Sequence, residues 1–356
     1  EKLSMGEPYV IRLKMPYEGD TIVHDELRGD IIFENSKIDD QVLLKSDGFP
    51  TYHLANIVDD YLMGITHVIR AEEWIASSPK HVQLYKAFGW EIPKWYHMPL
   101  LRNADKTKIS KRKNPVSLNY YIEEGYLKEG ILNFLALMGW SFGGDKEIFT
   151  LEEMIKNFSF DKVSLGDPVF DLVKLKWVNN HHMRMKDLDE LTKLAIPYFV
   201  RAGYYNNENI SDKDYEKLRR IVEITREGSQ TLKELPINAS IYFEDEFELP
   251  LLEEGMNKKE RKSVEKLISS LETETEKKSI SLFVEKLNAL NENISEEEAK
   301  KILYDLQEEL GEGPATVIMP LRAVITGKSK GSDLYTVISI VGKERVLKRI
   351  KNILEK

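Results

Sequence analysis

The stretch that decides the fold is residues 42–70, VLLKSDGFPTYHLANIVDDYLMGITHVIR. Its first residues, 42–45, are apolar and predict a short strand, and the Ser-Asp-Gly-Phe-Pro that follows is a strong turn sequence. Thr51 is a suitable N-cap residue for a helix that we expect to stop at Gly64. Residues 66–70 predict a second strand. The stretch is therefore a strand–helix–strand unit.

The same alternation continues along the chain. We expect a helix at 73–88 and a third strand at 95–101. Strands and helices that alternate at this spacing predict a parallel α/β sheet with crossover helices, and such sheets bind ligands off the carboxyl ends of their strands. Tyr52, Arg70 and Leu101 lie at or just after predicted strand ends. We therefore expect them to converge on one crevice.

The predicted helix after Thr51 has two faces. Tyr52, Asn56 and Asp59 share one face at i, i+4, i+7 spacing, opposite an apolar face. A plain solvated face fits this pattern as well as a ligand-binding face does, so the spacing alone leaves both open.

Residues 105–113, DKTKISKRK, carry five basic residues in a chain whose formal net charge is -9. A short basic loop in an acidic protein fits a phosphate-bearing partner, although a solvated surface loop has the same composition. Because the loop follows the third predicted strand, we expect it beside the crevice, and this position favours phosphate.

The flanking regions differ in character. Short strands are expected between Tyr9 and Phe33 as a small β unit, and beyond Met183 the periodicity is helical. His181 and His182 are adjacent, which is poor spacing for a metal pair, and we interpret them as a helix end. The predicted helices of the second half are roughly 187–203, 211–227, 231–235, 258–288, 295–310 and 343–355. The fold class is thus α/β followed by all-α.

The composition of the 356 residues, with 42% hydrophobic and 31% charged side chains, is that of an ordinary globular protein. The absence of cysteine excludes a disulfide framework and a thiolate zinc site within the chain, and fits a reducing cytoplasm. No apolar run approaches the roughly 18 residues of a membrane span. The opening residues Glu1-Lys2-Leu3-Ser4-Met5 lead us to expect a piece of a longer cytoplasmic protein.

Several long motifs resemble bacterial glutamyl-tRNA synthetases. SDGFPTYHLAN at 46–56, VDD at 58–60 and GITHVIRAEEW at 64–74 resemble the second half of the catalytic domain, and KISKR at 108–112 resembles the class I signature loop. Later segments of that family are similar to SLGDPVFD at 164–171, PLR at 320–322 and GKER at 342–345. The similarity covers nearly the whole chain and is weakest at about 237–310.

The resemblance implies a domain order. It implies the remainder of an acceptor-binding insertion (1–40), the second half of a Rossmann-like catalytic domain (41–104), a signature loop with a stem-contact domain (105–186), and a helical anticodon-binding domain (187–356) in two subdomains that divide near 237–257. It also implies a monomer.

The resemblance implies a two-step ligase reaction with ATP and Mg²⁺, with glutamate and tRNA(Glu) as partners and no zinc site within this chain. The implied glutamate site is Tyr52, Asn56 and Arg70, and Lys108, Lys111 and Arg112 are the implied catalytic residues. The implied ATP site is Glu73, Trp74, Leu101, Lys108, Ile109, Ser110 and Lys111. The implied tRNA contacts are Lys174, Trp177, Gly228, Arg322 and Leu334.

Two departures from the family pattern matter. The His-x-Gly-His motif is absent, since none of the seven histidines lies in such a pattern. We therefore expect this polypeptide alone to be an incomplete enzyme. Gly228 stands where members restricted to tRNA(Glu) commonly carry an anticodon-reading Arg, with Arg226 nearby. This predicts an enzyme that also charges tRNA(Gln).

Three alternatives remain in view. The first is a non-catalytic tRNA-binding fragment of such a synthetase, which would have no need of an intact Tyr52, Arg70 and Glu73. The second is the truncated paralogue that glutamylates queuosine, which lacks a helical anticodon domain. The third is a glutaminyl-tRNA synthetase, which is disfavoured because its C-terminal domains are β-barrels.

Overall fold

The computed structural model describes residues 3–109, 117–253 and 255–355. The chain forms two compact units, one of residues 1–120 with 128–178 and one of residues 121–127 with 179–356. The division after Val178 falls inside a helix, α6 (Leu172–Met185), a few residues before the border predicted at 186.

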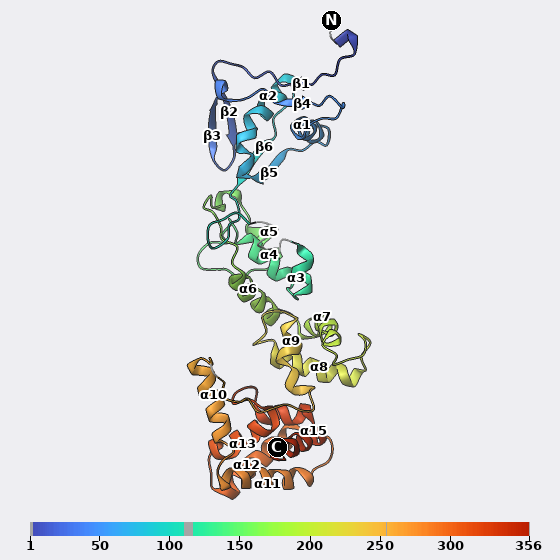
Figure 1. Ribbon diagram of the computed structural model, residues 1–356, viewed down its shortest axis with the longest axis vertical. Coiled ribbons are helices and arrows are strands. Elements are labelled where there is room, and N and C mark those ends of the chain that lie inside the picture. The colour runs from blue at the N-terminus through green and yellow to red at the C-terminus, as the bar shows by residue number, and fades with distance from the viewer. Residues whose placement is uncertain (1–2, 110–116, 254, 356) are drawn as a thin grey trace. The chain divides into compact units, whose positions relative to one another are not determined.

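A mixed sheet of four strands organises the first unit (Figure 1). Its order is β3 (Gly29–Glu34), β2 (Asp20–Asp25), β6 (Lys94–Met98) and β5 (His67–Ala71). β2 and β3 form an antiparallel hairpin, while β6 runs parallel to both of its neighbours. The predicted parallel pairing of the strands at 66–70 and 95–101 is thus confirmed.

The strand at the start of the deciding stretch does not join this sheet, so that part of the prediction was wrong. β4 (Val42–Leu44) pairs antiparallel with β1 (Ile11–Arg12) in a separate two-stranded sheet. The strand that pairs with β6 on the side away from β5 is β2, so the sheet includes residues from both sides of the border predicted at residue 40. β2 is rich in polar residues, yet Thr21 and Asp25 are buried because other side chains satisfy their hydrogen bonds.

The helices of the first unit begin with α1 (Tyr52–Leu62) and α2 (Ser78–Phe88). α1 starts where predicted, but the Thr51 hydroxyl donates to Val42 O instead of capping the helix. The helix predicted at 73–88 is divided: a 3₁₀ helix, η3 (Glu72–Ser77), precedes α2, because Pro79 is suited to the first turn of a helix and not to its interior.

The core of this part of the unit lies between the sheet and these helices, and it includes Val23, Ile57, Val82, Tyr85 and Trp95. Further helices follow α2 in this unit. They are α3 (Leu118–Glu123), which continues into the second unit, α4 (Lys128–Ala136), α5 (Leu151–Asn157), the 3₁₀ helix η4 (Phe160–Lys162) and α6.

The second unit is helical, as predicted (Figure 1). Its elements are α7 (Leu188–Arg201), α8 (Asp212–Thr225), α9 (Glu234–Asn238), η5 (Ser240–Tyr242), α10 (Lys258–Ser269), α11 (Glu274–Asn288), α12 (Glu296–Leu310), α13 (Pro314–Thr326), α14 (Leu334–Val341) and α15 (Lys343–Leu354). One hydrophobic core runs on both sides of the predicted division near 237–257.

Two predictions for the helical unit were wrong. The single helix expected at 258–288 is two helices, because Thr273 and Glu276 form a capping box that starts α11 afresh. α13 and α14 were missed. α13 is apolar around much of its circumference, so it lacks the two-faced pattern that sequence periodicity detects, whereas α14 has only eight residues, a length over which a helical period is poorly defined.

Candidate active site

Arg70 lies at the carboxyl end of β5 and is held there by three side chains. Its Nε donates to Nε2 of His97 (3.0 Å), its Nη2 to Oγ of Ser78 (2.8 Å), and its Nη1 to Nδ1 of His81 (3.2 Å). Burial lowers the pKa of Arg70, although Tyr52 and Asp60 act to raise it. None of the three groups holding the guanidinium carries a formal negative charge, so its cationic character remains available to an anion.

The groups that hold Arg70 were not identified from the sequence. Ser78, His81 and His97 are all fully buried, and behind His97 lies Asp25, which is only 1% exposed. Burial lowers the pKa of His81 to about 3 and also lowers that of His97, so both imidazoles are neutral near pH 7. Burial likewise lowers the pKa of His53, which hydrogen-bonds His81.

The predicted glutamate residues come together around this guanidinium. Tyr52, in the first turn of α1, packs on Trp74 with ring centroids 4.7 Å apart, and the Arg70 guanidinium lies 6.0 Å from the Trp74 ring. Asn56, one turn further along α1, donates to Asp60 Oδ2 (3.2 Å). Burial raises the pKa of Asp60, and the nearby Arg70 opposes this shift. Tyr52 and Asp60 therefore interact with Arg70, whereas Asp59, predicted on the same face as Tyr52, is exposed.

The first part of the basic loop is a tight hairpin. Asn103 N donates to Thr107 O (2.8 Å), and Asp105 Oδ1 accepts from the Thr107 backbone N–H (2.9 Å). Lys106 occupies the left-handed region at φ 65°. This turn brings Lys108 back beside the strand end, where it forms an isolated bridge with Arg102. Hydrogen bonds within residues 102–109 therefore determine the conformation of this part of the loop.

The hairpin joins several predicted ATP residues. Ile109 N donates to Leu101 O (3.5 Å), and the Lys108 ammonium pairs with the Glu73 carboxylate from η3. Trp74 follows Glu73 in the same 3₁₀ helix. Ser110, Lys111 and Arg112, predicted from the same loop, lie outside the described residues. The first half of the predicted phosphate-handling loop is therefore linked directly to η3.

The two predicted stem-contact residues are neighbours on α6. Lys174 Nζ lies 4.5 Å from the centre of the Trp177 ring and also pairs with Glu147. Trp177 remains 39% exposed, which is unusual for so large an apolar side chain. An exposed Trp under an Arg- or Lys-type cation is a suitable platform for a nucleotide base or backbone.

Gly228 and Arg322, predicted as anticodon contacts, line one pocket of about 240 Å³ in the helical unit. Lys328 and Lys330 line it too, and burial lowers the pKa of Arg322. Leu334, predicted with them, is only 2% exposed and packs its side chain in the helical core, so a contact with a nucleotide would have to come from its backbone.

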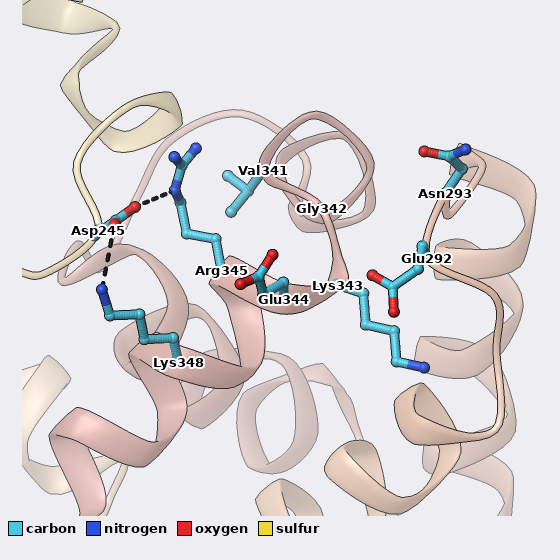
Figure 2. A pocket seen from close by; sticks show the side chains of 9 residues that line it. All are labelled: Asp245, Glu292, Asn293, Val341, Gly342, Lys343, Glu344, Arg345 and Lys348. Carbon is cyan, nitrogen blue, oxygen red and sulfur yellow. Dashed lines mark hydrogen bonds and ion pairs between the residues drawn. The ribbon is translucent and has the colours of Figure 1, made fainter.

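A second pocket of the helical unit, of about 340 Å³, surrounds the start of α15 (Figure 2). Arg345 and Lys348 both pair with Asp245, and Lys343 donates to the carbonyls of Asn288 (3.0 Å) and Leu290. Since protein groups engage all three cations, this pocket offers little to an anion.

No group of three or more His, Asp or Glu side chains arranged for a metal ion occurs among the described residues. In the same part of the chain, no helix is long and apolar enough to cross a membrane.

Comparison with known proteins covers both halves of the chain. Residues 1–177 match the family model described as tRNA synthetases class I (E and Q), catalytic domain, and residues 190–354 match the anticodon binding domain. The chain is 66% identical to the glutamate–tRNA ligase of Fusobacterium nucleatum over 357 residues, which is 100% of this chain and 70% of that protein. It is 46% identical to the glutamate–tRNA ligase of Thermus thermophilus over 99% of this chain and 71% of that protein.

A solved structure of a glutamate tRNA ligase is also similar to this chain. The crystal structure of a glutamate tRNA ligase from Elizabethkingia meningosepticum, in complex with its amino acid, is 32% identical with a TM-score of 0.83. The match covers 100% of this chain and 70% of that one.

Proposed function

Because the chain belongs to the glutamate–tRNA ligase family of class I aminoacyl-tRNA synthetases, we propose that it contributes the glutamate pocket, the signature loop and the tRNA-reading half of an enzyme that charges tRNA(Glu) with glutamate. The observation that supports this most directly is Arg70. It is a cation held in place by neutral side chains at the carboxyl end of a strand.

Arg70 is suited to the side-chain carboxylate of glutamate. A guanidinium binds a carboxylate through two parallel N–H···O bonds, and each terminal nitrogen of Arg70 has a second N–H beyond the one given to His81 or Ser78. Tyr52 and Asn56 would complete the pocket. The amide of Asn56 now donates to Asp60 and could turn toward the substrate.

The reaction we propose has two steps. A carboxylate oxygen of glutamate attacks the α-phosphorus of ATP, the bond to the β-phosphate bridging oxygen breaks, and pyrophosphate leaves. The 2′-hydroxyl of the terminal adenosine then attacks the acyl carbon and loses its proton, and AMP leaves. Both steps depend on positioning and charge stabilisation more than on covalent chemistry by the protein.

The basic loop would stabilise the charge that moves onto pyrophosphate. Lys108 pairs with Glu73, which holds the ammonium near η3 and the predicted ATP residues Trp74 and Leu101. We propose that the phosphates compete for Lys108, and that Ser110, Ile109, Lys111 and Arg112 act with it.

Magnesium would supply further neutralisation of phosphate charge when the nucleotide is bound. Mg²⁺ in such sites keeps several waters and takes most of its other ligands from the phosphates, so a cage of protein carboxylates is not needed. The lack of such a cage among the described residues is compatible with that mode of binding.

On the tRNA side we propose that Lys174 and Trp177 contact the stem and that the pocket of Gly228 and Arg322 receives anticodon nucleotides. Three cationic residues line this pocket, Arg322, Lys328 and Lys330, and none of its lining residues in the described part of the chain is acidic. Gly228 contributes space instead of a hydrogen-bonding fork. This supports an enzyme that also accepts tRNA(Gln).

The test is glutamylation of purified tRNA(Glu) and tRNA(Gln) by the natural full-length polypeptide, followed with labelled glutamate. Charging of both tRNAs is the expected result. Absence of glutamyl-tRNA(Gln) would refute the relaxed specificity alone. If neither tRNA is charged although both still bind, the ligase function is refuted and the alternative of a non-catalytic tRNA-binding protein is favoured.

A further inference from the structure

Asp25 is a buried carboxylate for which the proposed reaction has no use. It ends β2, is 1% exposed, and accepts four hydrogen bonds. Its Oδ1 accepts from the backbone N–H groups of Leu27 and Arg28 (both 2.9 Å), and its Oδ2 accepts from the backbone N–H (3.0 Å) and Nδ1 (2.6 Å) of His97. A buried charge is tolerated only when it is satisfied in this way.

This arrangement fixes the tautomer of His97. Since a carboxylate oxygen that faces donors on every side can only accept, the proton between Asp25 and His97 lies on Nδ1. Nε2 of His97 is then a lone-pair acceptor. It receives the Nε–H of Arg70 at 3.0 Å, on the opposite side of the ring from Asp25. The carboxylate therefore sets the chemical character of the atom that Arg70 contacts.

The sheet places these three residues side by side. Arg70 and His97 are register partners in the parallel pair of β5 and β6, and Asp25 is the register partner of Trp95 in the pair of β2 and β6. Side chains at paired positions lie on the same face of a sheet. A shift of one residue in either pairing would separate the line Asp25–His97–Arg70.

The neutral Nε2 of His97 affects the charge of Arg70 differently from a carboxylate at the same position. If Asp25 contacted Arg70 directly, the pair would cancel the positive charge before a substrate arrived. His97 instead orients the guanidinium without adding a second carboxylate to the nearby Asp60, which already interacts with Arg70. The backbone of His97 is fixed as well, because its carbonyl accepts from Arg28 Nε (3.0 Å), while Arg28 Nη2 pairs with Glu72 (2.7 Å).

We propose that His97, set in one tautomer by Asp25, is a positioning residue that aligns Arg70 for the side-chain carboxylate of the amino-acid substrate. This inference rests on the proposed function and assigns within it a role to two residues that do not touch the substrate.

The test compares two amide substitutions that differ by one methylene. In His97→Asn the amide nitrogen stands near the place of Nδ1 and can still donate to Asp25, but nothing reaches Arg70. In His97→Gln the amide oxygen stands near the place of Nε2 and can accept from Arg70. With the natural full-length polypeptide, His97→Asn should raise the KM for glutamate by about tenfold or more, and His97→Gln by less than about threefold.

Three further readouts separate positioning from mere packing. The KM values for ATP and tRNA should change less than about twofold in both variants, since neither ligand depends on Arg70. The Nε–H resonance of Arg70 should remain protected from exchange in His97→Gln and lose its protection in His97→Asn. The midpoint of thermal unfolding should fall by similar amounts in the two variants, because each removes one buried contact of the ring.

Equal glutamate KM values in the two variants, or a parallel rise in all three KM values, would overturn the positioning role. Absence of tRNA charging by the wild-type protein would refute the proposed function instead. In that case the Arg70 resonance still decides whether His97 orients the guanidinium: protection that survives in His97→Asn overturns the inference independently of activity.

Discussion

Replacing Arg70 by Lys keeps a positive charge at the end of β5 but removes the planar fork. The guanidinium uses three different nitrogens to contact His97, Ser78 and His81 at 2.8 to 3.2 Å. A lysine has one nitrogen and cannot span those acceptors while also facing a substrate. The perturbation therefore separates charge from geometry.

The size of the effect follows from the contacts. A hydrogen bond to a charged group contributes about 1.5 to 3 kcal/mol, and a lysine retains one of the two N–H···O bonds that the fork would make with the glutamate carboxylate. A loss of about 2 kcal/mol lowers kcat/KM for glutamate about 30-fold. Stability should fall by only about 1 kcal/mol, because Ser78 Oγ lies 3.2 Å from His97 Nε2 and can donate to it in place of Arg70 by turning its proton away from the Trp74 carbonyl.

The assay is tRNA glutamylation at a series of glutamate concentrations, with ATP and tRNA saturating. Arg12→Lys is the matched control, since Arg12 makes an exposed contact to the Asp40 carbonyl (3.0 Å) on β1, outside the four-stranded sheet. That control should change kcat/KM by less than about twofold. A kcat/KM for Arg70→Lys within about threefold of the wild type would refute the assignment of Arg70 to the substrate carboxylate.

Three further predictions follow from the same geometry. His81 has a pKa of about 3 in the folded protein and an ordinary value near 6.5 in the unfolded chain, so the unfolded state binds more protons between those pH values and the free energy of unfolding should fall below about pH 6.5, by up to about 1.4 kcal/mol per pH unit. Urea unfolding at pH 7, 6 and 5 should show a weaker pH dependence for His81→Asn, whose amide oxygen can still accept from Arg70. A pH dependence equal to that of the wild type would contradict this prediction. Gly125 has φ +81° and a Cβ added there would lie 2.7 Å from the backbone nitrogen of Lys233, so Gly125→Ala should destabilise the protein by about 2 kcal/mol or more. The control is Gly203→Ala, which has the same φ but open space around the new Cβ and should lose only about 1 kcal/mol to backbone strain. Equal losses of stability in thermal unfolding would contradict the role of the close contact. Gly228→Arg, where the nearest atom to a new Cβ is 4.0 Å away, should fit the fold and lower charging of tRNA(Gln) about tenfold or more while sparing tRNA(Glu); charging ratios that stay the same would refute the role of this position.

The elements that carry the candidate site could be predicted from the sequence. The strand and helix that contain Arg70 and Tyr52 follow from local apolar patterns and from Gly64 as a stop, and the structure confirms both. The long motifs around them identified the family, which the comparisons bear out. Local patterns succeed here because each depends on residues close in the chain.

The pairing of the strands could not be predicted in full. Val42–Leu44 has the apolar composition of a buried strand yet lies outside the four-stranded sheet, whereas β2, with its polar Thr21 and Asp25, is an inner strand of that sheet. Burial of those polar groups is stable because they are hydrogen-bonded, and several of the partners, Asn35 and Gln83 for Thr21 and His97 for Asp25, come from distant parts of the chain. Hydrophobicity along one segment carries no information about such partners.

The sequence by itself determined which residue types stand at the strand ends, where the basic loop lies, and that an all-helical half follows. Only the tertiary structure decided how Arg70 is held. His97 is 27 residues from Arg70 in the chain and Asp25 is 72 residues from His97, and the three meet because β2, β6 and β5 are neighbours in one register. That register depends on the packing of the whole sheet, whose free energy belongs to no single segment of the chain.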